Sequence, residues 1–253
     1  MQPQSIDDVI ISLTEIIENC EQSKNRSGYF AALYKRMTVA VKDGIANGSF
    51  LDGGRMEKLD VTFATRYLSA YEAYHKNEAC STSWKYAFDG CINQSLTVIQ
   101  QLILGINTHI NLDLAIASAI TAPGRAIDNL ETDFNRINSA IASLFDDVQQ
   151  CLEDVWLPMK LLKRVGKTQQ TDVLNFSIGA ARKTAWTNAV ILAGMNENQQ
   201  HAYIQQMDNT VYRIAQKIIH PGFLASTILR IVRVTEYDDV ARTIKLIDST
   251  VVE

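Results

Sequence analysis

The stretch Leu102-Ile-Leu-Gly-Ile-Asn-Thr-His-Ile-Asn-Leu-Asp-Leu114 decides the fold, because it is apolar on almost every side and still carries ionisable groups. At about 100° per residue, a helix places His109 and Asp113 within about 40° of each other on one face. Asn107 and Asn111 form a second polar pair on nearly the opposite side. A helix with apolar residues all round is a buried one, so we predict that this segment runs through the centre of the protein.

The rest of the chain has the pattern of amphipathic helices that can pack around this segment. No alternating strand pattern recurs, and no internal repeat of fixed period is found. We therefore predict an all-α fold, a single domain over residues 1–253 built as a multi-helix bundle around a central buried helix near residues 95–120. Helices are expected to begin at Ser5 and Gly28 and to cover about residues 56–75, 82 onward into the central segment, 128–162 with a break near Pro158, 172–193, 197–219, 225–234 and 239–247.

Composition limits the classes of partner. The 253 residues are 47% hydrophobic and 21% charged with a net charge of -4, which is typical of a soluble globular protein and gives no broad basic field for nucleic acid. The N-terminal residues lack the pattern of a signal peptide. Apolar runs are interrupted well before the roughly 20 residues that span a bilayer, so we expect a soluble protein without a membrane span. Four cysteines without a C-x-x-C spacing favour reduced thiols and a cytoplasmic location.

Ionisable residues recur on the apolar faces of four separate predicted helices. His109 and Asp113 share one stripe, Arg66 lies on a second, Asp133 on a third and Arg182 on a fourth. A buried charge must be paired, hydrogen-bonded or neutralised. Because two arginines, two aspartates and one histidine nearly balance, we predict that they converge inside the bundle.

Convergence of these groups is typical of a polar pocket for a small molecule. In this interpretation His109 acts as general acid or base, an aspartate orients its second nitrogen, and the arginines bind a carboxylate, phosphate or enolate oxygen. The function would be that of a small-molecule lyase, cyclase or hydrolase. The candidate catalytic residues are His109, Asp113 and Asp133, and the candidate substrate-binding residues are Arg66, Asn107, Asn111, Arg182 and Trp186.

Two alternatives stay open. The i, i+4 spacing of His109 and Asp113, together with Asp133, also suits a divalent-metal-dependent hydrolase, although two nearby arginines would oppose a cation. The sequence itself requires no cofactor. The other alternative is a non-catalytic helical scaffold or ligand-binding protein, in which the same groups form a structural ion-pair network.

The other histidines are expected at the surface, since His75 points away from Arg66 on its helix and His201 and His220 lie at polar helix ends. The chain lacks G-x-G-x-x-G, G-x-x-x-x-G-K-[ST], H-E-x-x-H and G-x-S-x-G. None of the enzyme types that these motifs mark is therefore indicated.

The run Gly105-Ile-Asn-Thr-His-Ile-Asn-Leu-Asp-Leu114 resembles the G-[MI]-N-x-H-I-N-x-D-L signature of an uncharacterised bacterial domain family of unknown function. Supporting matches are Phe63-Ala-Thr-Arg-Tyr67, Asp133-Phe134 with Asn138, and Arg182 with Ala185-Trp186. The resemblance covers about residues 55–195. It implies a helical bacterial protein of about this size and brings no activity with it.

Overall fold

The computed structural model describes residues 2–137, 178–236 and 238–249, and every regular element in these ranges is helical, as predicted. The elements are α1 (Ile6–Ser23), α2 (Gly28–Ala46), α3 (Gly53–His75), α4 (Thr82–Ile92), α5 (Val98–Thr108), the π-helix η1 (His109–Asp113), α6 (Leu114–Thr121), the 3-10 helix η2 (Gly124–Leu130), α9 (Ile178–Ala193), α10 (Glu197–Ile219), α11 (Phe223–Thr235) and α12 (Val240–Ser249).

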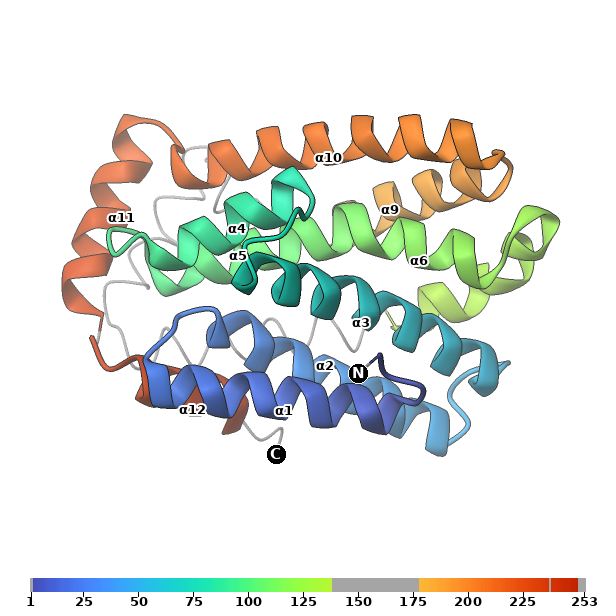
Figure 1. Ribbon diagram of the computed structural model, residues 1–253, viewed down its shortest axis with the longest axis horizontal. Helices are drawn as coiled ribbons and strands as arrows, with labels where there is room; N and C mark the ends of the chain where they lie inside the picture. The colour runs from blue at the N-terminus through green and yellow to red at the C-terminus, as the bar shows by residue number, and fades with distance from the viewer. Residues whose placement is uncertain (1, 138–177, 237, 250–253) are drawn as a thin grey trace.

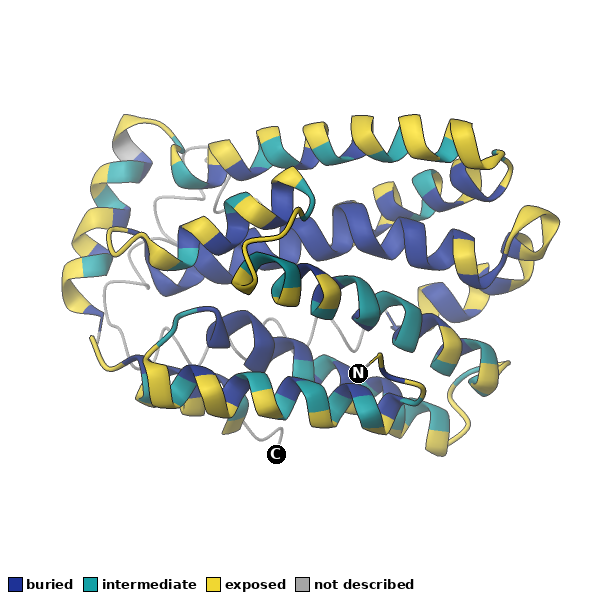
Figure 2. Ribbon diagram, viewed as in Figure 1, coloured by how far each residue is buried: buried dark blue, intermediate teal, exposed yellow. Residues whose placement is uncertain are grey.

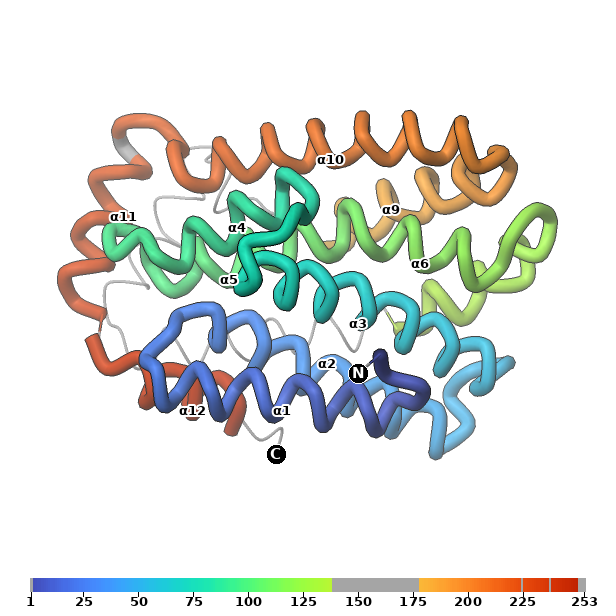
Figure 3. Tube along the Cα trace, viewed as in Figure 1, coloured from blue at the N-terminus to red at the C-terminus, as the bar shows by residue number. Residues whose placement is uncertain are grey.

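The central helix is formed by α5, η1 and α6, which follow one another without a break from Val98 to Thr121 (Figure 3). It begins at a capping box, in which the Thr97 hydroxyl accepts from the Gln100 amide N–H and the Gln100 side chain accepts from the Thr97 amide N–H. By length and composition this segment could cross a membrane, but 94% of its most apolar window is buried inside the protein. Figure 2 shows this nearly uniform burial. The segment is therefore a core helix of this bundle.

Other helices surround this segment on several sides. In Figure 1, α10 runs along one side of it, and α1, α2 and α12 lie on the other. Helices α2, α4 and α10 pack against α5, whereas α3 and α9 pack against α6. This arrangement confirms the predicted bundle around a central buried helix, and it brings α3, α9 and α10 up to the π-helical turn.

Two predicted boundaries were wrong for local reasons. The fourth helix does not continue into the central segment: it ends at Ile92, because the Asn93 side chain accepts hydrogen bonds from the backbone and hydroxyl of Ser95 and turns the chain. The third helix begins at Gly53 and not near Met56, because the Asp52 side chain caps the amide of Arg55. Both signals are side-chain caps, which the apolar periodicity does not contain.

The helix predicted over 128–162 is described only up to residue 137. Its first residues form the end of η2, and residues 131–137 are helical. The predicted break at Pro158, the loop over 163–170 and residues 172–177 of the next helix lie outside the described residues.

Gly105 permits a close approach between the central helix and α2. A Cβ atom at this position would lie 2.5 Å from the ring of Phe30, which is closer than any real contact. The glycine therefore accommodates the ring of a residue from a neighbouring helix, and Phe30 packs one turn before His109.

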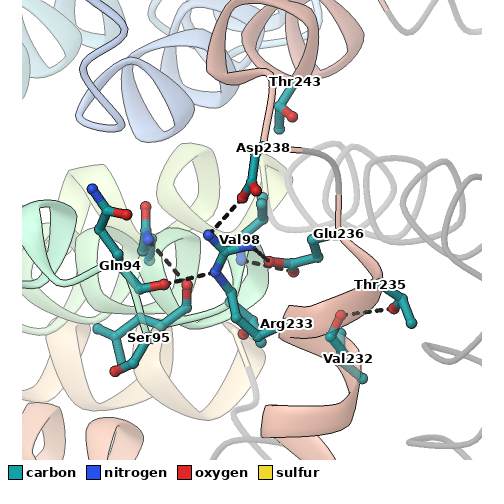
Figure 4. A network of polar contacts seen from close by, with 12 residues as sticks. Gln94, Ser95, Val98, Val232, Arg233, Thr235, Glu236, Asp238 and Thr243 are labelled. Atoms are coloured by element: carbon teal, nitrogen blue, oxygen red, sulfur yellow. Dashed lines mark hydrogen bonds and ion pairs between the residues drawn. The ribbon is translucent and has the colours of Figure 1, made fainter.

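The end of α11 and the residues that follow it hold the start of the central helix through a polar network (Figure 4). The Glu236 carboxylate accepts from the amide of Val98 at 2.9 Å, and the guanidinium of Arg233 donates to the carbonyl of Gln94 at 2.7 Å and to Asp238 at 3.0 Å. Burial raises the pKa of Glu236 to about 7. This network satisfies a backbone amide that the first turn of a helix leaves unpaired.

Candidate functional site

His109 and Asp113 lie at the two ends of the π-helical turn in the centre of the bundle. The amide of Leu114 donates to the carbonyl of His109, five residues earlier, which widens the turn. Nδ1 of His109 lies 3.1 Å from Oδ2 of Asp113, and both side chains are buried. The prediction that these residues share one face is therefore confirmed. Single π-turns are frequent at functional sites, which makes this departure from α-helix a local marker.

Asp113 is held by three donors from three helices. Arg66 Nε donates to Oδ1 at 2.9 Å, while Trp84 Nε1 and His109 Nδ1 both reach Oδ2. Burial alone raises the pKa of Asp113, but the hydrogen bond from His109 and the charge of Arg66 outweigh it and lower the pKa below its ordinary value. Asp113 is therefore a carboxylate at neutral pH, and its charge is balanced by Arg66.

The imidazole of His109 is oriented by these contacts. Its ring stacks on Phe63 with centroids 3.6 Å apart and planes 7° apart. Because a carboxylate can only accept, the proton lies on Nδ1 and Nε2 has a free lone pair. Burial is the main cause that lowers the pKa of His109, so the ring is neutral at pH 7. Nε2 is buried and has no hydrogen-bond partner within the described residues.

His109 lines a small, partly open cavity of about 50 Å³ between α2, α3, the central helix, residues 131–137 and α9. Most of its walls are apolar side chains, and its polar members are Tyr34, Asp60, His109 and Arg182. A concave, mostly apolar space with a few polar groups is the usual form of a small-molecule site. The residues that line it are Phe30, Tyr34, Met37, Val41, Met56, Leu59, Asp60, Phe63, Ile106, His109, Ile110, Leu114, Phe134, Ile137 and Arg182.

Tyr34 and Asp60 were missed by the reasoning from sequence. The Tyr34 hydroxyl and Oδ2 of Asp60 are buried and, like Nε2 of His109, lack a hydrogen-bond partner within the part of the chain described. Burial raises the pKa of Asp60 to about 8 and that of Tyr34 well above its ordinary value, so both are protonated at neutral pH. A signal existed for Asp60: it lies four residues after Met56 and seven before Tyr67 on the buried face of α3.

Arg182 reaches the same cavity from α9. Its guanidinium lies over the ring of Phe134, 4.4 Å from the centroid, and donates to the Phe134 carbonyl at 2.7 Å. Burial lowers its pKa to about 9, which still leaves it charged at neutral pH. Arg182 therefore brings a positive charge to a cavity whose other polar groups are neutral.

Arg66 and Asp113 also line a second, more open hollow of about 270 Å³, which lies along the later turns of α3 and beside the start of α4. The side chain of Arg66 is 31% exposed, whereas that of Asp113 is 1% exposed. Asp113 thus connects the buried imidazole on one side with a partly exposed guanidinium on the other.

The remaining candidates lie elsewhere. Asp133 does not line the cavity, because its oxygens accept from the amides of Leu51 and Asp52 at 2.7 and 3.0 Å and so hold the loop before α3. Asn111 donates to Asn107 at 3.1 Å, and Asn107 donates to the carbonyl of Val211 at 3.1 Å, so this pair ties the central helix to α10.

Trp186 packs against the ring of Phe134, with centroids 4.9 Å apart. It is half-buried and is not among the residues around the cavity. The prediction that Arg66, His109, Asp113, Asp133 and Arg182 converge at one point therefore needs correction, because three of them form one cluster, Arg182 faces the same cavity, and Asp133 caps a loop.

The metal-binding alternative lacks a matching ligand set. Within the described ranges no three His, Cys, Asp or Glu side chains are placed to hold one metal ion. His109 and Asp113 bond to each other, and the oxygens of Asp133 are directed at backbone amides. The site that the residues form is instead a hydrogen-bonded His–Asp pair.

The fold and the site define an all-α protein with an oriented His–Asp pair beside a small, mostly apolar cavity. A family model described as a family of unknown function (DUF5995) matches residues 6–221, and the chain belongs to that family. A search of curated proteins finds no match, and neither does a search of solved structures.

Proposed function

We propose that this protein is an enzyme that transforms a small molecule by acid–base chemistry, with Nε2 of His109 as the base. The observation that carries the proposal is that Nε2 is buried at a cavity without a hydrogen-bond partner among the residues that the structure describes, while Nδ1 is fixed by a carboxylate. A neutral imidazole oriented through its second nitrogen is the arrangement that general bases use.

Each neighbour has a definite part in this proposal. Asp113 fixes the tautomer and stabilises the imidazolium that forms when His109 takes a proton, as the carboxylate does in hydrolase triads. Arg66 and Trp84 keep Asp113 ionised and in place. Arg182 stabilises negative charge that develops on the substrate. Proton abstraction of this kind is a step that lyases, cyclases and hydrolases share.

The experiment is a screen of small metabolites in D2O, in which ¹H NMR detects product or the loss of substrate protons. We expect at least one compound to be turned over, and we expect His109→Gln to lower its rate by about 10²- to 10⁴-fold. His201→Gln is the matched control, because His201 is exposed on α10, and it should keep the full rate. An activity that survives in His109→Gln would show that the base is another group.

A ligand carrier without catalysis is the second candidate, favoured by the mostly apolar walls of the cavity. It predicts that the compound bound by the wild type is recovered unchanged after long incubation. We further propose a cytoplasmic setting, which is supported by the free thiols of Cys20, Cys80 and Cys91. A bacterial source is proposed from the sequence resemblance alone.

A further inference from the structure

The polar groups of the cavity other than the base are hydrogen-bond donors. At neutral pH Asp60 holds its proton, and so does Tyr34, so each presents an O–H group. Both side chains are nearly fully buried, and the Tyr34 hydroxyl and Oδ2 of Asp60 have no hydrogen-bond partner among the described residues. A buried donor without a partner costs free energy because it has lost its hydrogen bonds to water. A ligand that accepts from both groups removes this cost, and the free energy recovered favours its binding.

These donors stand close to the base. The rings of Tyr34 and His109 are in edge-to-face contact, with centroids 4.4 Å apart, and Asp60 lies one helical turn before Phe63, on which His109 stacks. Two donors and one lone pair around an apolar space match a molecule with an acceptor oxygen at one point and an acidic proton nearby. A carbonyl compound with a hydrogen on the adjacent carbon has both.

We propose that Tyr34 and Asp60 together bind the carbonyl oxygen of a small uncharged ketone or aldehyde, whose α-hydrogen then faces Nε2 of His109. The chemical step of this inference rests on the proposed function, in which His109 is the base. The binding of the carbonyl oxygen does not depend on that role. A protonated carboxyl and a tyrosine hydroxyl that donate to one oxygen are a known way to stabilise an enolate.

The step is a proton transfer that balances without a co-reactant. Nε2 takes the proton as the C–H bond breaks, the C–H electron pair forms the C=C bond, and the carbonyl π electrons move to the oxygen that Tyr34 and Asp60 hold. Return of a proton from the imidazolium to carbon completes the exchange. Arg182 adds positive potential at the same cavity.

The size of the cavity limits the ligand. An apolar cavity of about 150 Å³ holds the six carbon atoms of benzene, so 50 Å³ encloses two or three non-hydrogen atoms, enough for a carbonyl group and one adjacent carbon. Acetone is the natural probe, because its carbonyl and one methyl group fill this space while the second methyl group extends toward the open side of the cavity, and with so few atoms it is expected to bind in the millimolar range.

The binding experiment follows the ¹³C shift of [2-¹³C]acetone as it is titrated with protein. We expect a saturable downfield shift, because two donors polarise the carbonyl, and we expect Tyr34→Phe to weaken it about tenfold. Tyr67→Phe is the matched control: Tyr67 is also fully buried with an unpartnered hydroxyl among the described residues, but it does not line the cavity. Neither variant should melt at a lower temperature than the wild type, since each removes an unpartnered buried group.

The outcomes separate the two proposals. Loss of α-deuterium exchange into acetone in His109→Gln, with the ¹³C shift retained, supports the carbonyl site and the base together. A shift that Tyr34→Phe and Tyr67→Phe leave equally unchanged overturns the carbonyl site, even where His109→Gln abolishes another activity. The absence of any saturable shift overturns it too, and would mean that Tyr34 and Asp60 bond only to buried water.

Discussion

The indole N–H of Trp84 lies 2.7 Å from Oδ2 of Asp113, the same oxygen that accepts from His109. The pair joins α4 to the central helix through a buried, charge-assisted hydrogen bond. The Asp113 carboxylate can stay ionised in the core because both of its oxygens accept hydrogen bonds, Oδ1 from Arg66 and Oδ2 from Trp84 and His109.

Trp84→Phe tests this contact. The variant keeps most of the apolar surface but deletes the donor, and a hydrogen bond to a charged group contributes about 1.5–3 kcal/mol. We expect a loss of that size in the free energy of unfolding, measured by urea denaturation. Trp186→Phe is the control, since Trp186 is half-buried against Phe134, and it should cost about 1 kcal/mol or less. Equal losses in the two variants would speak against an energetic role for the Trp84 bond.

Asp60→Asn should change how stability depends on pH. The pKa of Asp60 is about 8 in the folded protein and 3.8 as its ordinary value, so the folded state keeps a proton that the unfolded chain releases. The wild type therefore loses stability as pH rises from about 4 to 8, by up to about 1.4 kcal/mol per unit from this one group. The asparagine variant lacks this loss.

Urea unfolding at pH 5 and pH 8 is the measurement. We expect the stability advantage of Asp60→Asn to grow by a few kcal/mol between the two values. Glu236→Gln serves as a comparison, because the pKa of Glu236 is about 7. The stability that the wild type loses through Glu236 is therefore lost below about pH 7, whereas the loss through Asp60 continues to about pH 8. A difference between Asp60→Asn and wild type that is constant over this range would mean that Asp60 is ionised in the fold.

Gly105→Ala probes the close approach of α2 to the central helix. Its new Cβ would meet the ring of Phe30 at 2.5 Å, and overpacking of a core costs about 1–3 kcal/mol. Because Phe30 also lines the cavity, acetone binding should weaken as well. Gly54→Ala is the matched control, because Gly54 lies in α3 and a Cβ there would have its nearest neighbouring atom 3.8 Å away. We expect its free energy of unfolding to stay the same or to rise by up to about 1 kcal/mol. A stabilised Gly105→Ala would contradict the packing described.

Asp133→Ala separates structure from chemistry. The variant removes the carboxylate that accepts from the amides of Leu51 and Asp52, and a hydrogen bond to a charged group contributes about 1.5–3 kcal/mol. We expect a clear drop in melting temperature, with the rate per folded molecule unchanged. A folded variant that has lost turnover would restore Asp133 to the catalytic residues.

The sequence predicted the site in part, for a physical reason. Periodicity shows which residues share a helix face, so the pairing of His109 with Asp113 and the burial of Arg182 could be predicted. Periodicity does not show which helix packs against which, so Asp133 was grouped with residues that it does not contact. Asp60 was missed because the apolar face predicted for its helix was the one that carries Arg66, and Asp60 lies about 120° from Arg66 around that helix.

Helix boundaries, too, were predicted where the apolar pattern marks them and missed where they depend on a single side-chain hydrogen bond. The α10 limits, Glu197 to Ile219, agree with the prediction, because Asn196 provides a side-chain cap at the start and His220-Pro221 ends the apolar pattern. The break between α4 and α5 was missed, since it depends on one hydrogen-bonded turn at Asn93 and not on the apolar pattern. The π-helical turn at His109 leaves no mark in hydrophobic spacing at all.

The most direct test of the central claim is the protonation state of His109, read from ¹⁵N chemical shifts of the imidazole nitrogens between pH 5 and pH 8. The oriented-base account predicts a neutral ring at pH 7 with the proton on Nδ1, Nε2 unprotonated, and a midpoint below the ordinary 6.5. An imidazolium at pH 7, protonated on both nitrogens and paired with Asp113, would contradict it and leave the cluster a structural ion pair.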